Sequence, residues 1–148
     1  MKTNVLMVCL GNICRSPLAE GILQRKVNPE QVFVDSAGTG GYHIGKAPDP
    51  RSIAVARKYG LHIENQQCRQ FQKSDFQNFD VIYAMDLSNF NNILKLAETP
   101  EDENKVKLLL TEVDLPVIEV PDPYYDDNGF EKVYQLIDTA CTAIAKKL

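Results

Sequence analysis

Short runs rich in β-branched and other apolar residues alternate along this chain with segments whose apolar residues recur at helical spacing. Four of these runs are expected to form buried strands, at residues 5–9, 31–36, 81–84 and 106–110. Such alternation is typical of a parallel sheet with helices on both faces, because parallel strands need long crossover connections. The predicted fold class is therefore three-layer α/β, with ligands expected beyond the carboxyl ends of the strands.

Helix-start signals stand between the expected strands. Ser16 precedes a proline and is expected to cap the first helix. Asp49 also precedes a proline and is expected to cap a second helix that ends near Gly60. Asp86 or Ser88 is a candidate cap for a third helix through Leu96, and residues 130–147 show the apolar spacing of a long last helix with lysines at its end. No repeat or linker interrupts this pattern, so the 148 residues are expected to form a single domain.

Composition limits the partners that the chain can have. The formal net charge of −4 at pH 7 argues against a nonspecific nucleic-acid binder, which needs a basic face. No apolar stretch reaches the roughly 18 residues of a transmembrane helix, and the first apolar run is too short for a signal peptide. The four cysteines are too few and too unevenly spaced for a disulfide framework or a structural zinc site. We therefore expect a cytoplasmic protein with reduced thiols and no membrane contact.

The stretch VCLGNICRSP joins the first expected strand to the first expected helix. A loop in this place lies at the ligand edge of the sheet, where its amides and the positive end of the helix can hold an anion. It is not a nucleotide-binding loop, because the GxxxxGK[ST] pattern and its lysine are missing. The cation is Arg15, whose planar fork matches two oxygens of a phosphate, and the same positive field favours a thiolate on Cys9. The loop therefore offers a nucleophile beside a phosphate site.

Cys9 and Arg15 stand six residues apart and a serine follows, a spacing shared by cysteine-dependent phosphatases. Together with PDPYYDD, the stretch VCLGNICRSPLAE resembles the low-molecular-weight protein tyrosine phosphatase family, and the resemblance extends over DSAGTGGYHIG, RQF with FD, and MDLSN. It implies one domain over residues 1–148, with four parallel strands in the order 2-1-3-4. It also implies hydrolysis of phosphotyrosine and small aryl phosphates through a cysteinyl-phosphate, with no metal and no cofactor. The implied partner is a tyrosine-phosphorylated protein, with a bacterial tyrosine kinase among the candidates, while inorganic phosphate is the product and a monomer or weak dimer is expected.

The resemblance also assigns roles to individual residues. Cys9 would be the nucleophile, Arg15 the phosphate clamp and Asp122 the general acid, which suits a leaving phenolate that needs a proton. Ser16 would donate a hydrogen bond to the thiolate, and Asn12 would brace the loop. The residues expected at the substrate are Leu10, Gly11, Asn12, Ile13, Cys14, Ser16, Tyr42 and Tyr124, and the expected supporting residues are Ser36, Asp86 and Tyr125.

Several other conspicuous side chains are expected to be structural. Cys141 lies on the apolar face of the last helix and is expected in the core, whereas Cys68, in a polar segment, is expected to be incidental. His43 and His62 are both expected to be exposed. Gln66 stands where relatives often have a histidine, three residues before the arginine of RQ, so the bracing of the loop is expected to differ in this chain.

Three alternative functions are left open by the sequence. An arsenate reductase has a similar fold and loop but relays electrons through further cysteines, for which Cys14, Cys68 and Cys141 are candidates. A protein-arginine phosphatase has threonine at the loop position that Ile13 occupies, so isoleucine favours the tyrosine phosphatase. A phosphocysteine carrier or a non-catalytic phospho-binding module must keep its phosphate from water. Asp122, as a general acid and base, would instead activate water and promote hydrolysis.

Overall fold

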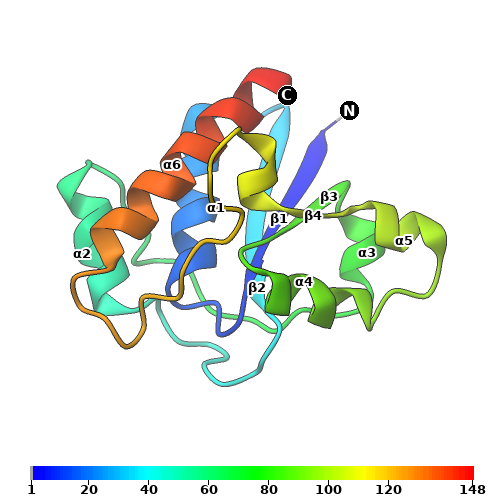
Figure 1. The fold of residues 1–148 in the computed structure, drawn as a ribbon, viewed down its shortest axis with the longest axis horizontal. Coiled ribbons are helices and arrows are strands. Elements are labelled where there is room, and N and C mark those ends of the chain that lie inside the picture. The colour runs from blue at the N-terminus through cyan, green and yellow to red at the C-terminus, as the bar shows by residue number, and fades with distance from the viewer. Residues whose placement is uncertain (1) are drawn as a thin grey trace.

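The computed structural model describes residues 2–148, and Figure 1 shows how the elements are arranged. The chain begins with β1 (Thr3–Cys9), α1 (Arg15–Lys26), β2 (Val32–Gly38) and α2 (Pro50–Lys58). It continues with α3 (Asp75–Asn78), β3 (Val81–Ala84), α4 (Leu87–Leu94) and α5 (Pro100–Asn104). It ends with β4 (Val106–Leu108), the 3₁₀ helix η1 (Leu109–Glu112) and α6 (Phe130–Lys147).

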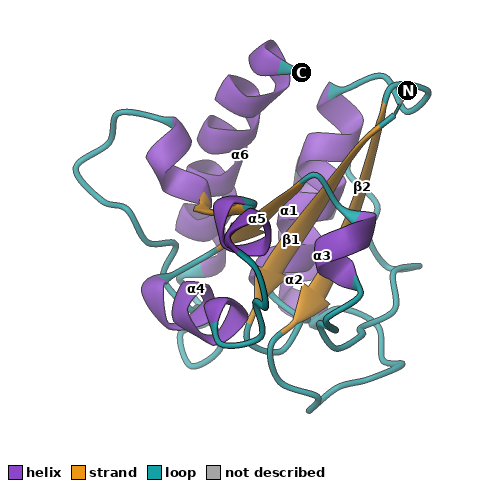
Figure 2. Ribbon diagram, turned by 90° about the vertical axis from the view of Figure 1, so that its right-hand side faces the viewer, coloured by secondary structure: helices purple, strands orange, loops and turns teal. Residues whose placement is uncertain are grey.

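The sheet is entirely parallel, and its strands lie in the order β2-β1-β3-β4. β1 reads as a continuous apolar run because helices cover it on both faces. Val5 and Met7 belong to one core cluster with α1 and α6, whereas Leu6 and Val8 belong to a second cluster with residues of α3 and α4. Figure 2 shows these two helical layers on either side of the strands. The predicted α/β class and the strand order 2-1-3-4 are confirmed.

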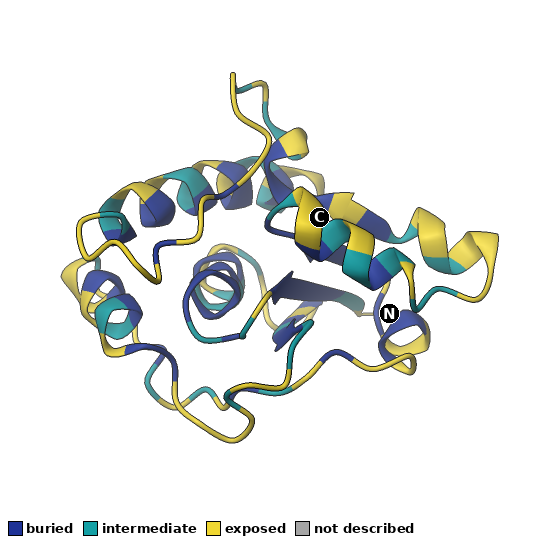
Figure 3. Ribbon diagram, turned by 60° about the horizontal axis from the view of Figure 1, so that its bottom comes forward, coloured by how far each residue is buried: buried dark blue, intermediate teal, exposed yellow. Residues whose placement is uncertain are grey.

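α1 is held firmly between the sheet and α6. Leu18, Ala19, Ile22 and Leu23 have no exposed surface, and Figure 3 shows the strands and the inward faces of the helices as buried. Burying a leucine or isoleucine side chain contributes about 1.5–3 kcal/mol, so this packing fixes the helix strongly. The N-terminus of α1, where the loop after β1 ends, is therefore a rigid platform.

The start of α1 differs from the sequence prediction. The helix begins at Arg15, its N-cap is Cys14, and no side chain caps it. The prediction that Ser16 is the cap is wrong, since Ser16 lies inside the helix and is fully buried. The side chain of Ser16 is thereby free for contacts inside the protein.

Other predicted boundaries are largely met. Asp49 and Asp86 cap α2 and α4 through hydrogen bonds from backbone amides, and the last helix covers residues 130–147 as predicted. The last strand is shorter than predicted, because the chain turns into η1 after Leu108. α3 and α5 escaped prediction, since helices of four and five residues carry no periodic apolar stripe. Within residues 2–148, no helix combines the length and the apolar character needed to cross a membrane.

Gly38, the last residue of β2, lies directly against the loop that follows β1. A Cβ atom at this position would stand 2.7 Å from the carbonyl oxygen of Leu10 and 3.0 Å from the backbone nitrogen of Asn12. Both neighbours are backbone atoms, which cannot swing aside as a side chain can. Glycine is required here because the strand and the loop approach so closely.

Replacing Gly38 by alanine should destabilise the protein by about 1–3 kcal/mol, because the added methyl group must displace the loop. The measurement is urea unfolding. Gly129→Ala is a matched control, since its Cβ would meet nothing closer than 3.2 Å and that neighbour is the side chain of Asp126. Equal stability of Gly38→Ala and the parent protein would show that the loop moves freely.

Candidate active site

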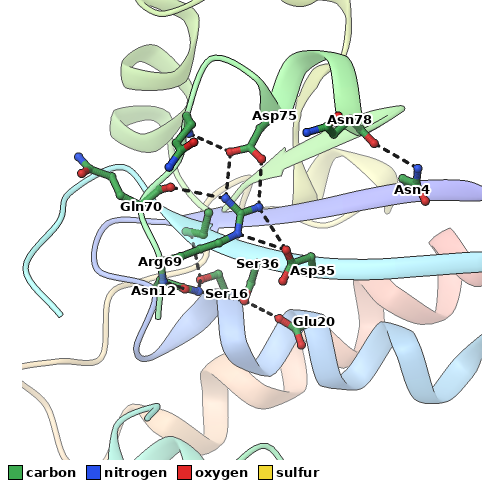
Figure 4. A network of polar contacts seen from close by, with 12 residues as sticks. Asn4, Asn12, Ser16, Glu20, Asp35, Ser36, Arg69, Gln70, Asp75 and Asn78 are labelled. Carbon is green, nitrogen blue, oxygen red and sulfur yellow. Dashed lines mark hydrogen bonds and ion pairs between the residues drawn. The ribbon is translucent and has the colours of Figure 1, made fainter. Parts of the chain in front are cut away.

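Asn12 occupies the tip of the loop between β1 and α1 with a left-handed backbone, at φ 56°. Its side-chain Nδ2 donates to Ser16 Oγ at 2.8 Å and to Ser36 Oγ at 2.9 Å. Its Oδ1 accepts from the backbone N–H of Arg69 at 2.9 Å, and its carbonyl oxygen accepts from the Cys68 thiol at 2.7 Å. A left-handed backbone is uncommon for a residue with a side chain, and these contacts offset its strain. Figure 4 shows the network around Asn12.

The segment carrying Arg69 is anchored in its turn. The guanidinium of Arg69 donates to Asp35 at 3.2 Å and to both carboxylate oxygens of Asp75 at 3.1 Å. The fork therefore ties β2 to the beginning of α3, as Figure 4 shows. The backbone amide of Arg69 is thus held in place where it meets Asn12.

Cys9 ends β1 with only 2% of its surface exposed. Its Sγ lies 3.1 Å from Ser16 Oγ. Ser16 Oγ also accepts from Asn12 Nδ2 and lies 3.4 Å from the carbonyl oxygen of Ala37, to which its hydroxyl can donate. Its single hydrogen therefore has two neighbouring acceptors, the carbonyl oxygen of Ala37 and, when Cys9 is a thiolate, the sulfur.

Arg15 is a buried charge with three partners. Its Nη1 donates to Asp86 Oδ2 at 2.6 Å and to the carbonyl oxygen of Val120 at 2.9 Å, and its Nη2 lies 3.8 Å from Asp122 Oδ2. Burial acts to lower the pKa of Arg15, but the negative charges on Cys9, Asp86 and Asp122 outweigh it and raise that pKa above its usual value. The guanidinium is therefore permanently charged and fixed beside Cys9.

A pocket of about 430 Å³ opens over the loop. It brings together three segments that are distant in the sequence: the loop itself, residues 42–43 and residues 122–125. Asp122 has 41% of its side chain exposed, and its Oδ1 accepts from the backbone N–H of Tyr124 at 3.0 Å. The lining residues are Cys9, Leu10, Gly11, Ile13, Cys14, Arg15, Tyr42, His43, Asp122, Tyr124 and Tyr125.

The remaining residues singled out in the sequence stand behind the pocket rather than in its wall. Asn12, Ser16 and Ser36 form the bracing network, and Asp86 holds Arg15 from the far side. His43 departs from prediction, because it is half-buried and lines the pocket instead of standing free in solvent. Its ring packs against Gly11, a contact that no local sequence signal could reveal.

Comparisons with known proteins agree with this geometry. The family model described as low molecular weight phosphotyrosine protein phosphatase matches residues 4–148. The chain belongs to this family.

Among its relatives is low molecular weight phosphotyrosine protein phosphatase 1 of Drosophila melanogaster, which is 42% identical over 99% of this chain and 97% of its own length. The crystal structure of YfkJ from Bacillus subtilis superposes with a TM-score of 0.93 at 38% identity, covering 99% of this chain and 94% of that one. The structure of Vibrio vulnificus Wzb in complex with benzylphosphonate superposes with a TM-score of 0.88 at 34% identity, covering all of both chains. The predicted enzyme class, a protein-tyrosine phosphatase, is thereby confirmed.

The other cysteines of the phosphatase are buried thiols. Burial, and next the charge of Asp49, raises the pKa of Cys14 to about 12, and burial followed by the charge of Cys9 raises the pKa of Cys68 to about 11. Cys141 lies in the core of α6 as predicted, and burial raises its pKa as well. The expectation that Cys68 is incidental is wrong, because its thiol supports the carbonyl of Asn12.

Gln66 does not replace a histidine in bracing Asn12. Its Nε2 donates to the carbonyl oxygen of Pro17 at 3.1 Å, and the amide of Asn12 is held by Ser16, Ser36 and the backbone of Arg69 instead. His62 is exposed as expected. No group of three or more His, Cys, Asp or Glu side chains in the described part of the chain is arranged to hold a metal ion.

Glu20 of α1 closes the bracing network at its outer end. Its Oε1 accepts from Ser36 Oγ at 2.6 Å. Burial raises the pKa of Glu20 to about 7, an effect opposed by the Ser36 hydrogen bond and by Arg69 and reinforced by Asp35. The carboxyl group therefore gains or loses its proton near neutral pH.

The titration of Glu20 should make stability depend on pH. The folded protein keeps this proton up to pH about 7, whereas the unfolded chain loses it near the ordinary value of 4.5. Folding therefore takes up a proton between these values, and the free energy of unfolding should fall as pH rises through this window, by on the order of 1–2 kcal/mol.

Urea unfolding of the parent and of Glu20→Gln at pH 5 and pH 8 measures this contribution. Between pH 5 and pH 8 the parent should lose stability relative to Glu20→Gln, because glutamine has no proton to lose. Glu101→Gln on the exposed surface of α5 is the control and should show no such trend. A parent–variant difference that is constant with pH would contradict the assignment.

Proposed function

We propose that the phosphatase hydrolyses phosphotyrosine in proteins and small aryl phosphates through a cysteinyl-phosphate intermediate. Cys9 is the nucleophile, Arg15 clamps the phosphate, and Asp122 transfers protons. The observation that carries this proposal is the meeting of all three side chains in one pocket, with Asp122 Oδ2 3.8 Å from Arg15 Nη2. Around them the loop amides and the N-terminus of α1 supply positive field for a dianion.

In the first step the Cys9 thiolate attacks phosphorus while Arg15 and the loop amides hold the nonbridging oxygens. The S–P bond forms and the bond from phosphorus to the phenolic oxygen breaks. Asp122, protonated, gives its proton to that oxygen so that a neutral phenol leaves. Asp122 is suited to this step because it lies at the pocket mouth, where the leaving group must stand.

In the second step the carboxylate of Asp122 takes a proton from water as the water oxygen attacks phosphorus. The S–P bond breaks, inorganic phosphate forms, and the electron pair returns to Cys9. The Ser16 hydroxyl, 3.1 Å from the sulfur and held by Asn12, stabilises the departing thiolate. Asp122 is thereby protonated again and ready for the next substrate.

The pocket walls favour an aromatic phosphate. Leu10, Ile13, Tyr42 and Tyr124 line the same pocket as Cys9 and present apolar surface to it. A flat ring placed between them brings its phosphate down to the loop, whereas a short alkyl phosphate leaves this surface uncovered. The Vibrio vulnificus relative has been crystallised with benzylphosphonate, a ligand of this shape, which supports the proposal.

The alternative functions are less well supported. A reductase needs several further thiols that can reach the nucleophile. Cys14 lines the same pocket as Cys9, but Cys141 is fully buried in α6 and Cys68 is buried while bonded to Asn12, so Cys14 has no further thiol to which it could pass electrons. A carrier would need a site free of a general base, whereas Asp122 opens directly onto the pocket. Ile13 continues to favour the tyrosine phosphatase over the arginine phosphatase.

The cellular setting follows as part of the same proposal. Residues 1–148 act as one catalytic domain, a monomer or weak dimer, in the cytoplasm. Its partner is a tyrosine-phosphorylated protein, such as a tyrosine kinase that phosphorylates itself. Tyr125, 94% exposed at the pocket rim, and Tyr42 are placed to touch the protein around the phosphotyrosine.

The role of Asp122 can be tested with phenols of graded acidity. Asp122→Asn should slow phosphorylation of Cys9 by phosphotyrosine peptides on the order of 10²–10⁴-fold, because tyrosine is a poor leaving group without a proton. Strongly activated aryl phosphates should lose far less in this step. Single-turnover rates against leaving-group acidity give the measurement, and an unchanged slope in the variant would mean that another residue is the acid.

Removal of metal should leave the activity intact, because Arg15 and the loop amides supply the positive charge in this mechanism. The measurement is aryl phosphate hydrolysis with and without a chelator. Cys9→Ser is the negative control and should lose on the order of 10³-fold or more in kcat. Recovery of chelated enzyme only on addition of a divalent metal would overturn the mechanism.

A further inference from the structure

A second hollow, of about 620 Å³, lies along α1 away from the active-site pocket. It is lined by Glu20, Gly21, Gln24 and Arg25 of α1 and by residues 60–63, 65 and 66 after α2. It shares no lining residue with the active-site pocket. It is broad and open to solvent.

The Glu20 carboxyl lines this hollow and has no ion-pair partner among the described residues. It accepts a hydrogen bond only from Ser36. Gln66 also lines the hollow, but its Oε1 has no solvent-exposed surface and is out of reach of a ligand, and its Nε2 is bonded to Pro17. The guanidinium of Arg25 is committed elsewhere, to the carbonyl of Tyr59 and the hydroxyl of Tyr134.

These features define the chemistry of a matching ligand. Buried acceptors are stabilised by donors, and a carboxylate is best matched by a positively charged donor. A primary ammonium or an amidinium carries such a charge and several N–H groups for the Glu20 carboxylate. The apolar side chains of Leu61 and Ile63, which also line the hollow, suit a small apolar body attached to that group.

A chain of hydrogen bonds joins this hollow to the nucleophile. The amide of Asn12 donates one hydrogen to Ser16 Oγ and the other to Ser36 Oγ. Ser36 in turn donates to Glu20 Oε1, as Figure 4 shows, and Ser16 Oγ lies 3.1 Å from Cys9 Sγ, where its hydroxyl can donate to a thiolate. Because hydrogen bonds in such a chain polarise one another, a change of charge at Glu20 alters the bond received by Cys9.

We propose that this hollow is an effector site for a small organic cation, which pairs with Glu20 and alters catalysis through Ser36, Asn12 and Ser16. Binding at the site is independent of the proposed catalytic roles. Its effect on turnover rests on them.

Binding can be tested with benzamidine, an amidinium on an apolar ring, against its uncharged isostere benzamide. The full chain is first saturated with inorganic phosphate, so that the active-site pocket is filled. Calorimetry and backbone amide shifts should show benzamidine binding along residues 20–25 and 60–66, with benzamide at least ~10-fold weaker because it lacks the charge. Equal affinity for the two compounds, or shifts confined to residues 9–15, would overturn the proposal.

Two variants locate the site. Glu20→Gln keeps the shape of the side chain and should weaken benzamidine binding about tenfold or more. Asn65→Trp leaves Glu20 and its hydrogen-bond chain untouched but places a large ring on the exposed rim of the hollow, and it should weaken binding while leaving basal activity unchanged. Unaltered affinity in both variants would place the ligand elsewhere.

The pH dependence of binding gives an independent check. Benzamidine needs the carboxylate form of Glu20, whose pKa of about 7 reflects burial, opposed by the Ser36 hydrogen bond and by Arg69 and reinforced by Asp35. Affinity should therefore rise between pH 6 and pH 8. His62 and Arg25 at the rim are the other charged groups facing the hollow, and His62→Asn should preserve the trend. Affinity that falls over this range would contradict pairing with Glu20.

Transmission to the active site is read from kcat at saturating aryl phosphate. Benzamidine should change kcat about twofold or more in the parent and leave it unchanged in Asn65→Trp, whereas a ligand in the active-site pocket would raise KM alone. Ser36→Ala breaks the chain, so it should still bind benzamidine but lose the change in kcat. Binding without any change in the parent kcat would refute the transmission. Absence of phosphatase activity would refute the proposed function and leave the binding result to stand by itself.

Discussion

The amide side chain of Asn12 is the interaction on which the site depends. It lies at the one described non-glycine residue with a left-handed backbone, and both its oxygen and its nitrogen are bonded to neighbouring elements. Its amide holds Ser16, whose hydroxyl oxygen lies 3.1 Å from the Cys9 sulfur, and through Ser36 it reaches β2 and α1. Without these bonds the loop would lose the shape in which its amides converge, because a left-handed backbone is costly even for asparagine, which adopts it more readily than most residues with a side chain.

The buried charge of Arg15 imposes a second constraint. A guanidinium removed from water is costly unless it is paired, so Asp86 and the carbonyl of Val120 must be in place before the loop can close over it. Asp86 comes from the end of β3 and Val120 from the segment leading to Asp122. The phosphate site is therefore assembled from the whole parallel edge of the sheet and not from the loop alone.

The sequence predicts those features that are local in the chain. The apolar runs of β1 and β3, the spacing of Cys9 and Arg15, and the length of α6 follow from periodicity and from residues a few positions apart. What it misses depends on contacts across the fold. Cys68 looked incidental because its partner is the backbone of Asn12, fifty-six residues away, and Ser16 looked like a helix cap because only the packed structure shows its hydroxyl turned inward.

The two carboxylate oxygens of Asp86 accept hydrogen bonds from different parts of the chain. Oδ1 accepts from the backbone of Asn89 and starts α4, while Oδ2 holds Arg15. Formation of α4 and orientation of the Arg15 side chain are therefore coupled through one carboxylate. When the protein refolds, its activity should return only once β3 and α4 have packed against the segment from β1 to α2. A nascent chain that has emerged only as far as α2 would carry the complete signature loop and still be inert.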